Sequence, residues 1–140
     1  MTGKALIDTN LLVYAYDLSE PEKQQKAVTV IDRLVALDSA VVCSQVLSEF
    51  FVTVTKKIPE PLTLEEAELR IVHFCQIWSV LHVNEMIIIE AIRGVKTHKL
   101  SYWDALIWAT ARLNQVGTVL SEDFSNDSFI EGIRFVNPLL

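Results

Sequence analysis

The segment Ala5-Leu6-Ile7-Asp8-Thr9-Asn10 starts with a short, fully apolar run that stops at an acid. Consecutive apolar residues followed by Asp-Thr-Asn are typical of a buried strand that leads into a helix. Short, mostly apolar runs recur at residues 40–43, 80–83, 118–120 and 133–136. These runs predict a sheet of four to five strands.

Helical patterns separate these runs. Residues 20–37 are predicted to be helical, and Ser44 is predicted to be the N-cap of a helix over 45–57. A capping box of Thr63 and Glu66 predicts a helix to about residue 78. Asn84 is expected to cap the next helix, and a strongly apolar helix over 101–116 is expected to end at Gly117. The alternation indicates an α/β protein with three α/β/α layers around a central, mainly parallel sheet.

Length, composition and net charge limit the kinds of protein that this chain can be. A chain of 140 residues fits one domain, over 1–140, and 51% of its residues are hydrophobic. No apolar stretch approaches the roughly 20 residues of a membrane-spanning helix, and the N-terminus does not resemble a signal peptide, so we expect a cytoplasmic protein. Cys43 and Cys75 are expected to be buried free thiols. The net charge of −6 argues against a nucleic-acid substrate unless the excess carboxylates bind divalent cations.

Acids follow the predicted strands. Asp8 comes directly after the first strand, Glu49 lies one turn into the helix after the second, and Asp123 follows the fourth. Asp104 lies in the first turn of an apolar helix, where an ionised carboxylate needs compensation. The carboxyl ends of parallel strands form the crevice where ligands bind, so we expect these acids to meet. Oxygen ligands suit Mg²⁺ or Mn²⁺.

Each acid also has an ordinary structural interpretation. Asp8 is a suitable helix N-cap, Glu49 lies at the border of the apolar helix face, and Ser101 with Asp104 forms a capping pair. A loop acid such as Asp123 is usually solvated, and two neighbouring acids could replace it, namely Glu122 and Asp127. The metal-site hypothesis therefore depends on the set of acids and not on any single one.

The ordered set of motifs resembles the PIN-domain ribonucleases, most closely the VapC-type toxins of prokaryotic type II toxin–antitoxin modules. The matching segments span nearly the whole chain and are residues 6–10, 44–50, 100–107, 120–124 and 136–138. The resemblance implies a PIN-like fold, Mg²⁺ or Mn²⁺ as cofactor, endonucleolytic cleavage of RNA, homodimers and a cognate antitoxin protein. Matched by position, the catalytic and metal-binding acids are Asp8, Glu49, Asp104 and Asp123. Asn10 and Ser121 fall where polar side chains often support the metal.

The mechanism expected from these motifs is hydrolysis by metal-activated water. Phosphate contacts are expected from the densest basic stretch, Arg93, Lys96, His98 and Lys99, and Arg112 is a further candidate RNA-binding residue. A solvated helix end explains the basic stretch equally well.

Two other functions remain open at this stage. The first is a non-catalytic PIN-like scaffold that binds RNA or protein, which typically lacks one or more of the acids. The second is phosphotransfer with Asp8 as nucleophile. This chemistry is disfavoured because position 10 is Asn and no lysine follows a later strand end.

Overall fold

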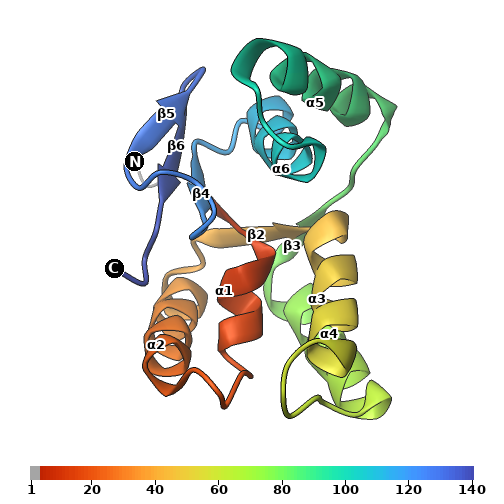
Figure 1. Cartoon of the computed structure of the whole chain (residues 1–140), viewed down its shortest axis with the longest axis vertical. Helices are drawn as coiled ribbons and strands as arrows, with labels where there is room; N and C mark the ends of the chain where they lie inside the picture. The colour runs from red at the N-terminus through yellow and green to blue at the C-terminus, as the bar shows by residue number, and fades with distance from the viewer. Residues whose placement is uncertain (1–3) are drawn as a thin grey trace.

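The computed structural model describes residues 4–140 and contains a six-stranded sheet with the order β3-β2-β1-β4-β6-β5 (Figure 1). All neighbouring strands are parallel except β5 and β6. Leu6 in the central strand pairs with Val41 on one side and with Val119 on the other. The strands are β1 (Ala5–Ile7), β2 (Ala40–Cys43), β3 (Ser79–Leu81), β4 (Thr118–Leu120), β5 (Ser128–Ile130) and β6 (Ile133–Val136).

The prediction of four to five strands missed β5. This strand exposes Phe129 and has no continuous apolar run, so nothing in its pattern marks it as a buried strand. It pairs antiparallel with β6 through a two-residue turn, in which Glu131 and Gly132 both have positive φ. Two positive φ values suit a tight hairpin, and Gly132 adopts this conformation without steric cost.

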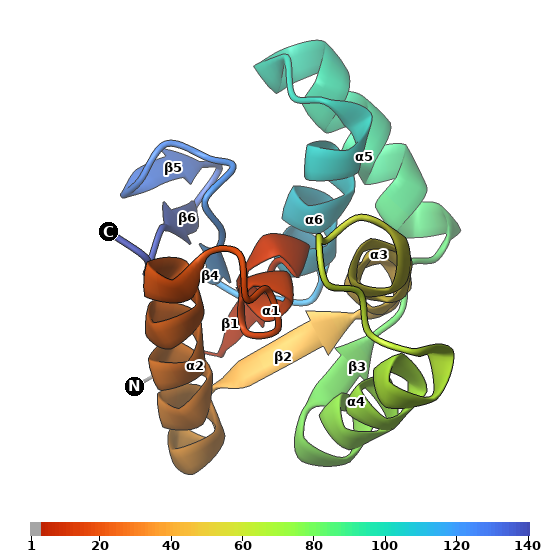
Figure 2. The same ribbon diagram turned by 60° about the horizontal axis from the view of Figure 1, so that its bottom comes forward.

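The helices form two layers. Figure 1 shows α1 to α4 on one side of the sheet and α5 with α6 on the other, and Figure 2 shows α1 between α2 and α3. The prediction of a mainly parallel sheet between helical layers is thus confirmed. The helices are α1 (Thr9–Tyr14), α2 (Pro21–Leu37), α3 (Ser44–Lys56), α4 (Leu64–Ile77), α5 (Glu85–His98) and α6 (Tyr102–Leu113).

Several predicted helix starts are confirmed. Asp8 caps α1, Asn84 caps α5 and Ser101 caps α6, each by accepting a backbone N–H with its side chain. The capping box of Thr63 and Glu66 opens α4. These side chains replace backbone partners that the first turn of a helix lacks.

Two predicted helix ends are wrong. Ser44 is the first residue of α3, whose N-cap is Cys43, and the Ser44 hydroxyl accepts the backbone N–H of Val83. Helix α6 ends at Leu113, before Gly117, and the chain turns with Gln115 at φ 53°. The turn after α6 therefore does not use the conformational freedom of glycine.

The core fills the space between the sheet and both helical layers. Strands β1 and β2 are buried along their whole length, as is α6 from Ala105 to Ala111, which confirms the predicted buried helix. Helix α5 packs on α6 at Gly94, where an added Cβ would lie 2.7 Å from the Trp108 ring.

The two cysteines differ. Cys43 is buried as predicted, but Cys75 is exposed because it lies on the solvent side of α4.

No helix within residues 4–140 combines the length and apolarity needed to cross a membrane.

Candidate active site

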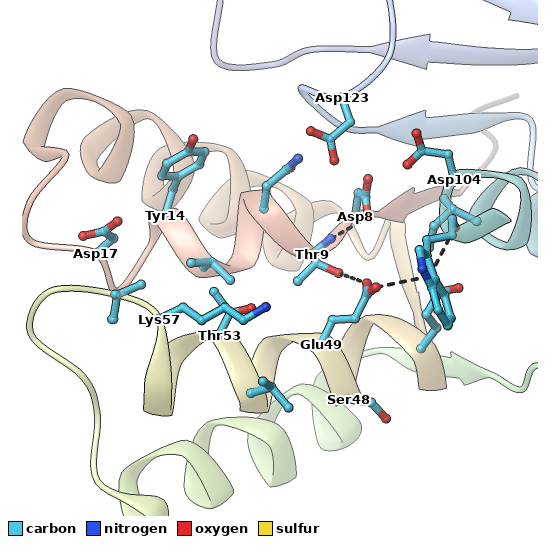
Figure 3. A pocket seen from close by; sticks show the side chains of 17 residues that line it. Asp8, Thr9, Tyr14, Asp17, Ser48, Glu49, Thr53, Lys57, Asp104 and Asp123 are labelled. Atoms are coloured by element: carbon cyan, nitrogen blue, oxygen red, sulfur yellow. Dashed lines mark hydrogen bonds between the residues drawn. The ribbon is translucent and has the colours of Figure 1, made fainter. Parts of the chain in front are cut away.

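The candidate site lies where the order of the sheet reverses. The chain passes from β1 to β2 on one side and later places β4 on the other side of β1. Such a switch point leaves a crevice beyond the carboxyl ends of the strands. A cavity of about 690 Å³ opens there, and all four predicted acids line it: Asp8, Glu49, Asp104 and Asp123 (Figure 3). We call this cavity the acidic groove.

Asp8 forms the buried base of the acidic groove, with 4% of its surface exposed. Its Oδ1 accepts the backbone N–H of Thr9 at 2.7 Å, and its Oδ2 accepts the hydroxyl of Ser121 at 2.7 Å. Burial, assisted by the charges of Asp123 and Glu49, raises the pKa of Asp8 to about 6 against the stabilising effect of these hydrogen bonds. Asp8 is therefore both a helix cap and a carboxylate that is costly to ionise.

Ser121 connects two of the acids. Its buried hydroxyl donates to Asp8 and accepts the backbone N–H of Asp123 at 3.0 Å. One side chain at the end of β4 thus orients the acid that follows β1 and the loop that carries Asp123. This geometry agrees with the supporting role expected for Ser121.

Glu49 lies on α3 and faces the start of α1. Its Oε1 accepts the hydroxyl of Thr9 at 2.7 Å, and its Oε2 lies 3.4 Å from the side-chain nitrogen of Gln45. Figure 3 shows the Glu49 carboxylate directed into the acidic groove toward Thr9. The sequence analysis did not identify Thr9 as a site residue, although its place beside Asp8 at a helix start was a usable signal.

Asp104 and Asp123 face the acidic groove from opposite sides of its upper edge (Figure 3). Partial burial raises the pKa of both carboxyls above the ordinary aspartate value. The charge of Glu49 raises the pKa of Asp104 further, and the charges of Asp104 and Glu122 do the same for Asp123. The neighbouring charges thus make Asp104 and Asp123 harder to ionise, which is the expected effect of like charges in one cavity.

The loop after β4 contains three acids, and the structure separates them. Asp123 lines the acidic groove, whereas Glu122 accepts a hydrogen bond from Tyr14 and lies 3.2 Å from the ammonium of Lys23. Asp127 pairs with Arg134 at 2.7 Å. Because Glu122 and Asp127 have these partners and neither lines the groove, Asp123 is the acid of this loop available to a ligand.

Asn10 supplies a further polar group at the acidic groove. It lines the cavity, and its side-chain amide is buried beside Asp123, where a hydrogen bond from Asn10 opposes the rise in the Asp123 pKa. The amide oxygen has no hydrogen-bonding partner among the described residues. Asn10 can therefore support Asp123 and still offer an oxygen to a ligand or an ordered water beside the acids.

The predicted RNA-binding arginines lie elsewhere. Arg93 donates to Glu90 and Glu131, Arg112 lies 3.2 Å from Glu90, and His98 lies 2.6 Å from Glu131. We call these five residues the charge network. Neither arginine lines the acidic groove, nor do Lys96 and Lys99, which are exposed near the end of α5.

The groove does contain one basic side chain, which the sequence analysis missed. Lys57 immediately follows α3 and is the only basic residue among the described residues that line the cavity. No motif marks it, because its role depends on the course of α3 along the groove.

The electrostatics of the acidic groove favour a bound divalent cation. Within residues 4–140 no lysine or arginine forms an ion pair with any of the four acids. Four carboxylates in one cavity, of which Asp8, Asp104 and Asp123 have raised pKa values, fit an oxygen-liganded ion such as Mg²⁺ or Mn²⁺. In this described part of the chain, no three His, Cys, Asp or Glu side chains already form a closed metal-binding arrangement. Binding would therefore require the carboxylates to move closer together.

The family model described as the PIN domain matches residues 5–125, whereas no curated protein matches the sequence. Solved structures with a similar fold include a toxin–antitoxin complex from Klebsiella pneumoniae, 21% identical with a TM-score of 0.65, which covers 96% of this chain and 98% of that one. FitAcB from Neisseria gonorrhoeae is 20% identical with a TM-score of 0.64, covering 96% and 97%. VapC20 from Mycobacterium tuberculosis, described as a toxin that cleaves the sarcin–ricin loop, is 18% identical with a TM-score of 0.63, covering 94% and 99%.

Proposed function

This chain belongs to the PIN domain family, and on that basis we propose that it is a Mg²⁺- or Mn²⁺-dependent endoribonuclease that hydrolyses RNA phosphodiester bonds in the acidic groove. The observation that carries the proposal is the meeting of four carboxylates at the switch point of the sheet, with no basic partner among the described residues. A carboxylate cluster of this kind binds a divalent cation, and that cation attracts phosphate. The net charge of −6 is then compatible with a polyanionic substrate.

Each residue has a distinct role in this proposal. Asp8 and Asp104 would hold the main ion, and Glu49 and Asp123 would complete one or two ion positions. When bound, the ion supplies a nucleophile at neutral pH, because it lowers the pKa of a coordinated water, and it offsets the charge of the scissile phosphate. The protein itself holds the metal-binding carboxylates in position.

Three neighbouring side chains support these acids. Ser121 holds Asp8 and the Asp123 loop, and Thr9 holds Glu49. The Asn10 amide lies beside Asp123 and would support the ion or a water bound to it. Hydrogen bonds of this kind around a metal site commonly decide whether the ligands have the correct orientation.

We further propose that the protein is a VapC-type toxin that acts as a homodimer in the cytoplasm and is controlled by a cognate antitoxin. The support is the fold shared, over nearly the whole of both chains, with the toxin–antitoxin complex from Klebsiella pneumoniae and with the toxin VapC20. The 51% hydrophobic composition and exposed apolar residues such as Ile89 and Leu69 are consistent with protein partners.

The alternative function is a PIN-like scaffold that binds RNA or protein without cleaving it. The retention of all four acids in one groove disfavours this alternative. The same geometry disfavours aspartyl phosphotransfer, because Asp8 is buried and both its oxygens accept hydrogen bonds from the chain.

The test is cleavage of a total cellular RNA pool by purified protein in Mg²⁺, in Mn²⁺ and in chelator, beside Asp104→Asn. Discrete fragments that require the metal and disappear with the variant support the nuclease. Cleavage that survives the variant contradicts the assignment of the site. Absence of both metal binding and cleavage favours the scaffold, and isothermal titration with Mn²⁺ measures the binding directly.

A further inference from the structure

Asp123 is held in the acidic groove differently from the other three acids. Those three lie in a helix or at its N-cap, whereas Asp123 lies in the loop between β4 and β5. Partial burial, followed by the charges of Asp104 and Glu122, raises the pKa of Asp123, so its ionised form is repelled by its neighbours. A loop acid under such repulsion keeps its place only if the residues around it are anchored.

Glu122, the residue before Asp123, is anchored to two helices. Its Oε1 accepts the hydroxyl of Tyr14 at the end of α1, and its Oε2 accepts the ammonium of Lys23 on α2 at 3.2 Å. Lys23 also donates to the Tyr14 hydroxyl at 3.1 Å and lies 4.7 Å from the centre of the Tyr14 ring. Each of the three side chains thus contacts the other two, and we call Tyr14, Lys23 and Glu122 the anchoring triad.

Tyr14 links the anchoring triad to the acidic groove. It lines the groove, whereas Lys23 and Glu122 do not. Figure 3 shows its hydroxyl pointing away from α3, toward the side of the groove where Asp123 lies. Burial and the hydrogen bond to Glu122 raise the pKa of Tyr14, so the hydroxyl keeps its proton at neutral pH and donates it. The Glu122 carboxylate is therefore satisfied outside the groove, while the next residue along the chain faces into it.

The residue after Asp123 is anchored as well. Phe124 stacks on Phe135 of β6, with ring centres 3.9 Å apart and an angle of 18° between the ring planes. Phe124 thus ties the loop to the sheet, whereas Glu122 ties it to α1 and α2. Asp123 lies between these two anchored neighbours, and its backbone N–H donates to Ser121.

We propose that Tyr14, Lys23 and Glu122 are positioning residues that hold Asp123 at the edge of the acidic groove before an ion binds. This inference rests on the proposed metal-dependent function and extends it to three residues beyond the four acids. The anchoring triad fixes the backbone directly before Asp123. It also keeps the second acid of the loop, Glu122, turned away, so that the loop presents one carboxylate to the ion and not two.

Tyr14→Phe removes one hydroxyl without changing the charge of the protein. We expect it to weaken Mn²⁺ binding about two- to tenfold, the effect of losing one hydrogen bond, as measured by isothermal titration. In chelator, the Asp123 amide should exchange with solvent faster than in the wild type, because its loop opens more readily, and NMR measures this rate. The control is Tyr16→Phe, outside the groove, which should change neither quantity. Wild-type affinity and exchange in Tyr14→Phe would overturn the proposal.

The Asp123→Asn background distinguishes positioning from general support of the fold. If the anchoring triad acts through Asp123, Tyr14→Phe should weaken Mn²⁺ binding in the wild type but have little further effect in Asp123→Asn, where that ligand is already replaced. Urea unfolding of each variant establishes that the titrated protein is folded. Equal fold-losses of affinity in both backgrounds would mean that the hydroxyl acts on the whole structure, and this result would overturn the proposal.

Lys23→Met tests the charged member of the triad. Loss of a positive charge near the groove should by itself strengthen cation binding, so the expected two- to tenfold weakening would identify lost position as the cause. Lys23→Arg keeps the charge and the donors and should retain most of the affinity. The control is Lys26→Met, about one turn further along α2, where Lys26 donates to the Leu139 carbonyl. Tighter Mn²⁺ binding in Lys23→Met would overturn the positioning role of Lys23.

The outcomes also separate this inference from the proposed function. Wild-type protein that binds no Mn²⁺ would contradict the metal-dependent nuclease, and the exchange rate of the Asp123 amide would then decide the positioning role alone. Mn²⁺-dependent cleavage by the wild type, with affinity and exchange unchanged in Tyr14→Phe, would support the nuclease and contradict the anchoring triad.

Discussion

Acidic side chains cluster in two regions of this molecule. In one region basic side chains pair with the acids, and in the other region they do not. In the charge network, Glu90 and Glu131 contact Arg93, Arg112 and His98, and these contacts lower the pKa values of both glutamates, that of Glu131 to about 2. The network joins the turn between β5 and β6 to α5 and α6. Its charges are balanced within the protein.

In the acidic groove the carboxyl pKa values move the other way. Burial and mutual repulsion raise the pKa values of Asp8, Asp104 and Asp123, and no cationic side chain among the described residues pairs with them. In the charge network the fold supplies cationic partners for its acids, whereas among the described residues it supplies none that pair with the acids of the groove. A bound cation would restore the balance, which is why perturbed carboxyls in a cleft are candidates for function.

The largest expected difference between the two regions is in activity. Glu49→Gln and Glu131→Gln remove the same charge from the two regions. We expect Glu49→Gln to lower metal-dependent RNA cleavage at least about 100-fold, because it removes a metal ligand, and Glu131→Gln to leave the rate nearly unchanged. Initial rates at saturating Mn²⁺ measure both. Similar losses in the two variants would show that the distinction between the regions is wrong.

A smaller loss is expected from Ser121→Ala. The Ser121 hydroxyl holds Asp8 and the Asp123 backbone, so its removal should misorient two ligands and lower metal affinity or activity about 10- to 100-fold. Isothermal titration with Mn²⁺ measures the affinity. The control is Ser125→Ala, in the same loop but outside the groove. An unchanged affinity in Ser121→Ala would exclude a supporting role for this hydroxyl.

Much of this site was predictable because strand ends and helix caps are local features. Asp8 follows an apolar strand, and Ser101 caps the helix that carries Asp104, so sequence spacing alone placed these residues at the correct edge of the sheet. The parallel arrangement then brought the acids together. The predicted supporting residue Ser121 also lies where it contacts two of them.

The features of the site that the sequence did not predict depend on contacts distant in sequence, and the RNA-binding role of the arginines stays a prediction. Arg93 and Arg112 looked available for RNA, but Glu131, on a hairpin turn that the sequence pattern did not reveal, lies against both. Lys57 has no motif and enters the groove only because α3 runs along it. Local patterns identify which elements form, whereas the pairing of charges across elements follows from the assembled fold.

The stability of the metal-free protein offers a further contrast. In chelator at pH 7, Asp8→Asn should raise the free energy of unfolding by roughly 1–3 kcal/mol, because the folded protein must ionise a buried carboxyl whose pKa is raised from 3.8 to about 6. A raised carboxyl pKa makes wild type lose stability as pH rises from about 4 to 6. The advantage of the variant should therefore disappear at pH 4 in urea unfolding curves. An advantage that persists at pH 4 would contradict this cause.

The smallest expected effect is that of Glu131→Gln on stability, with the opposite sign. Glu131 is paired at the surface, so we expect its loss to lower the free energy of unfolding by about 1 kcal/mol or less. Because pairing with Arg93 and His98 depresses the pKa of Glu131 from 4.5 to about 2, the stabilisation is complete above pH 5 and is lost as pH falls toward 2. The wild-type and Glu131→Gln unfolding curves should thus converge in acid, and the difference should shrink in high salt, which screens exposed charges. A difference that grows on acidification would mean that Glu131 is not held by its cationic neighbours and would remove the basis for contrasting the charge network with the acidic groove.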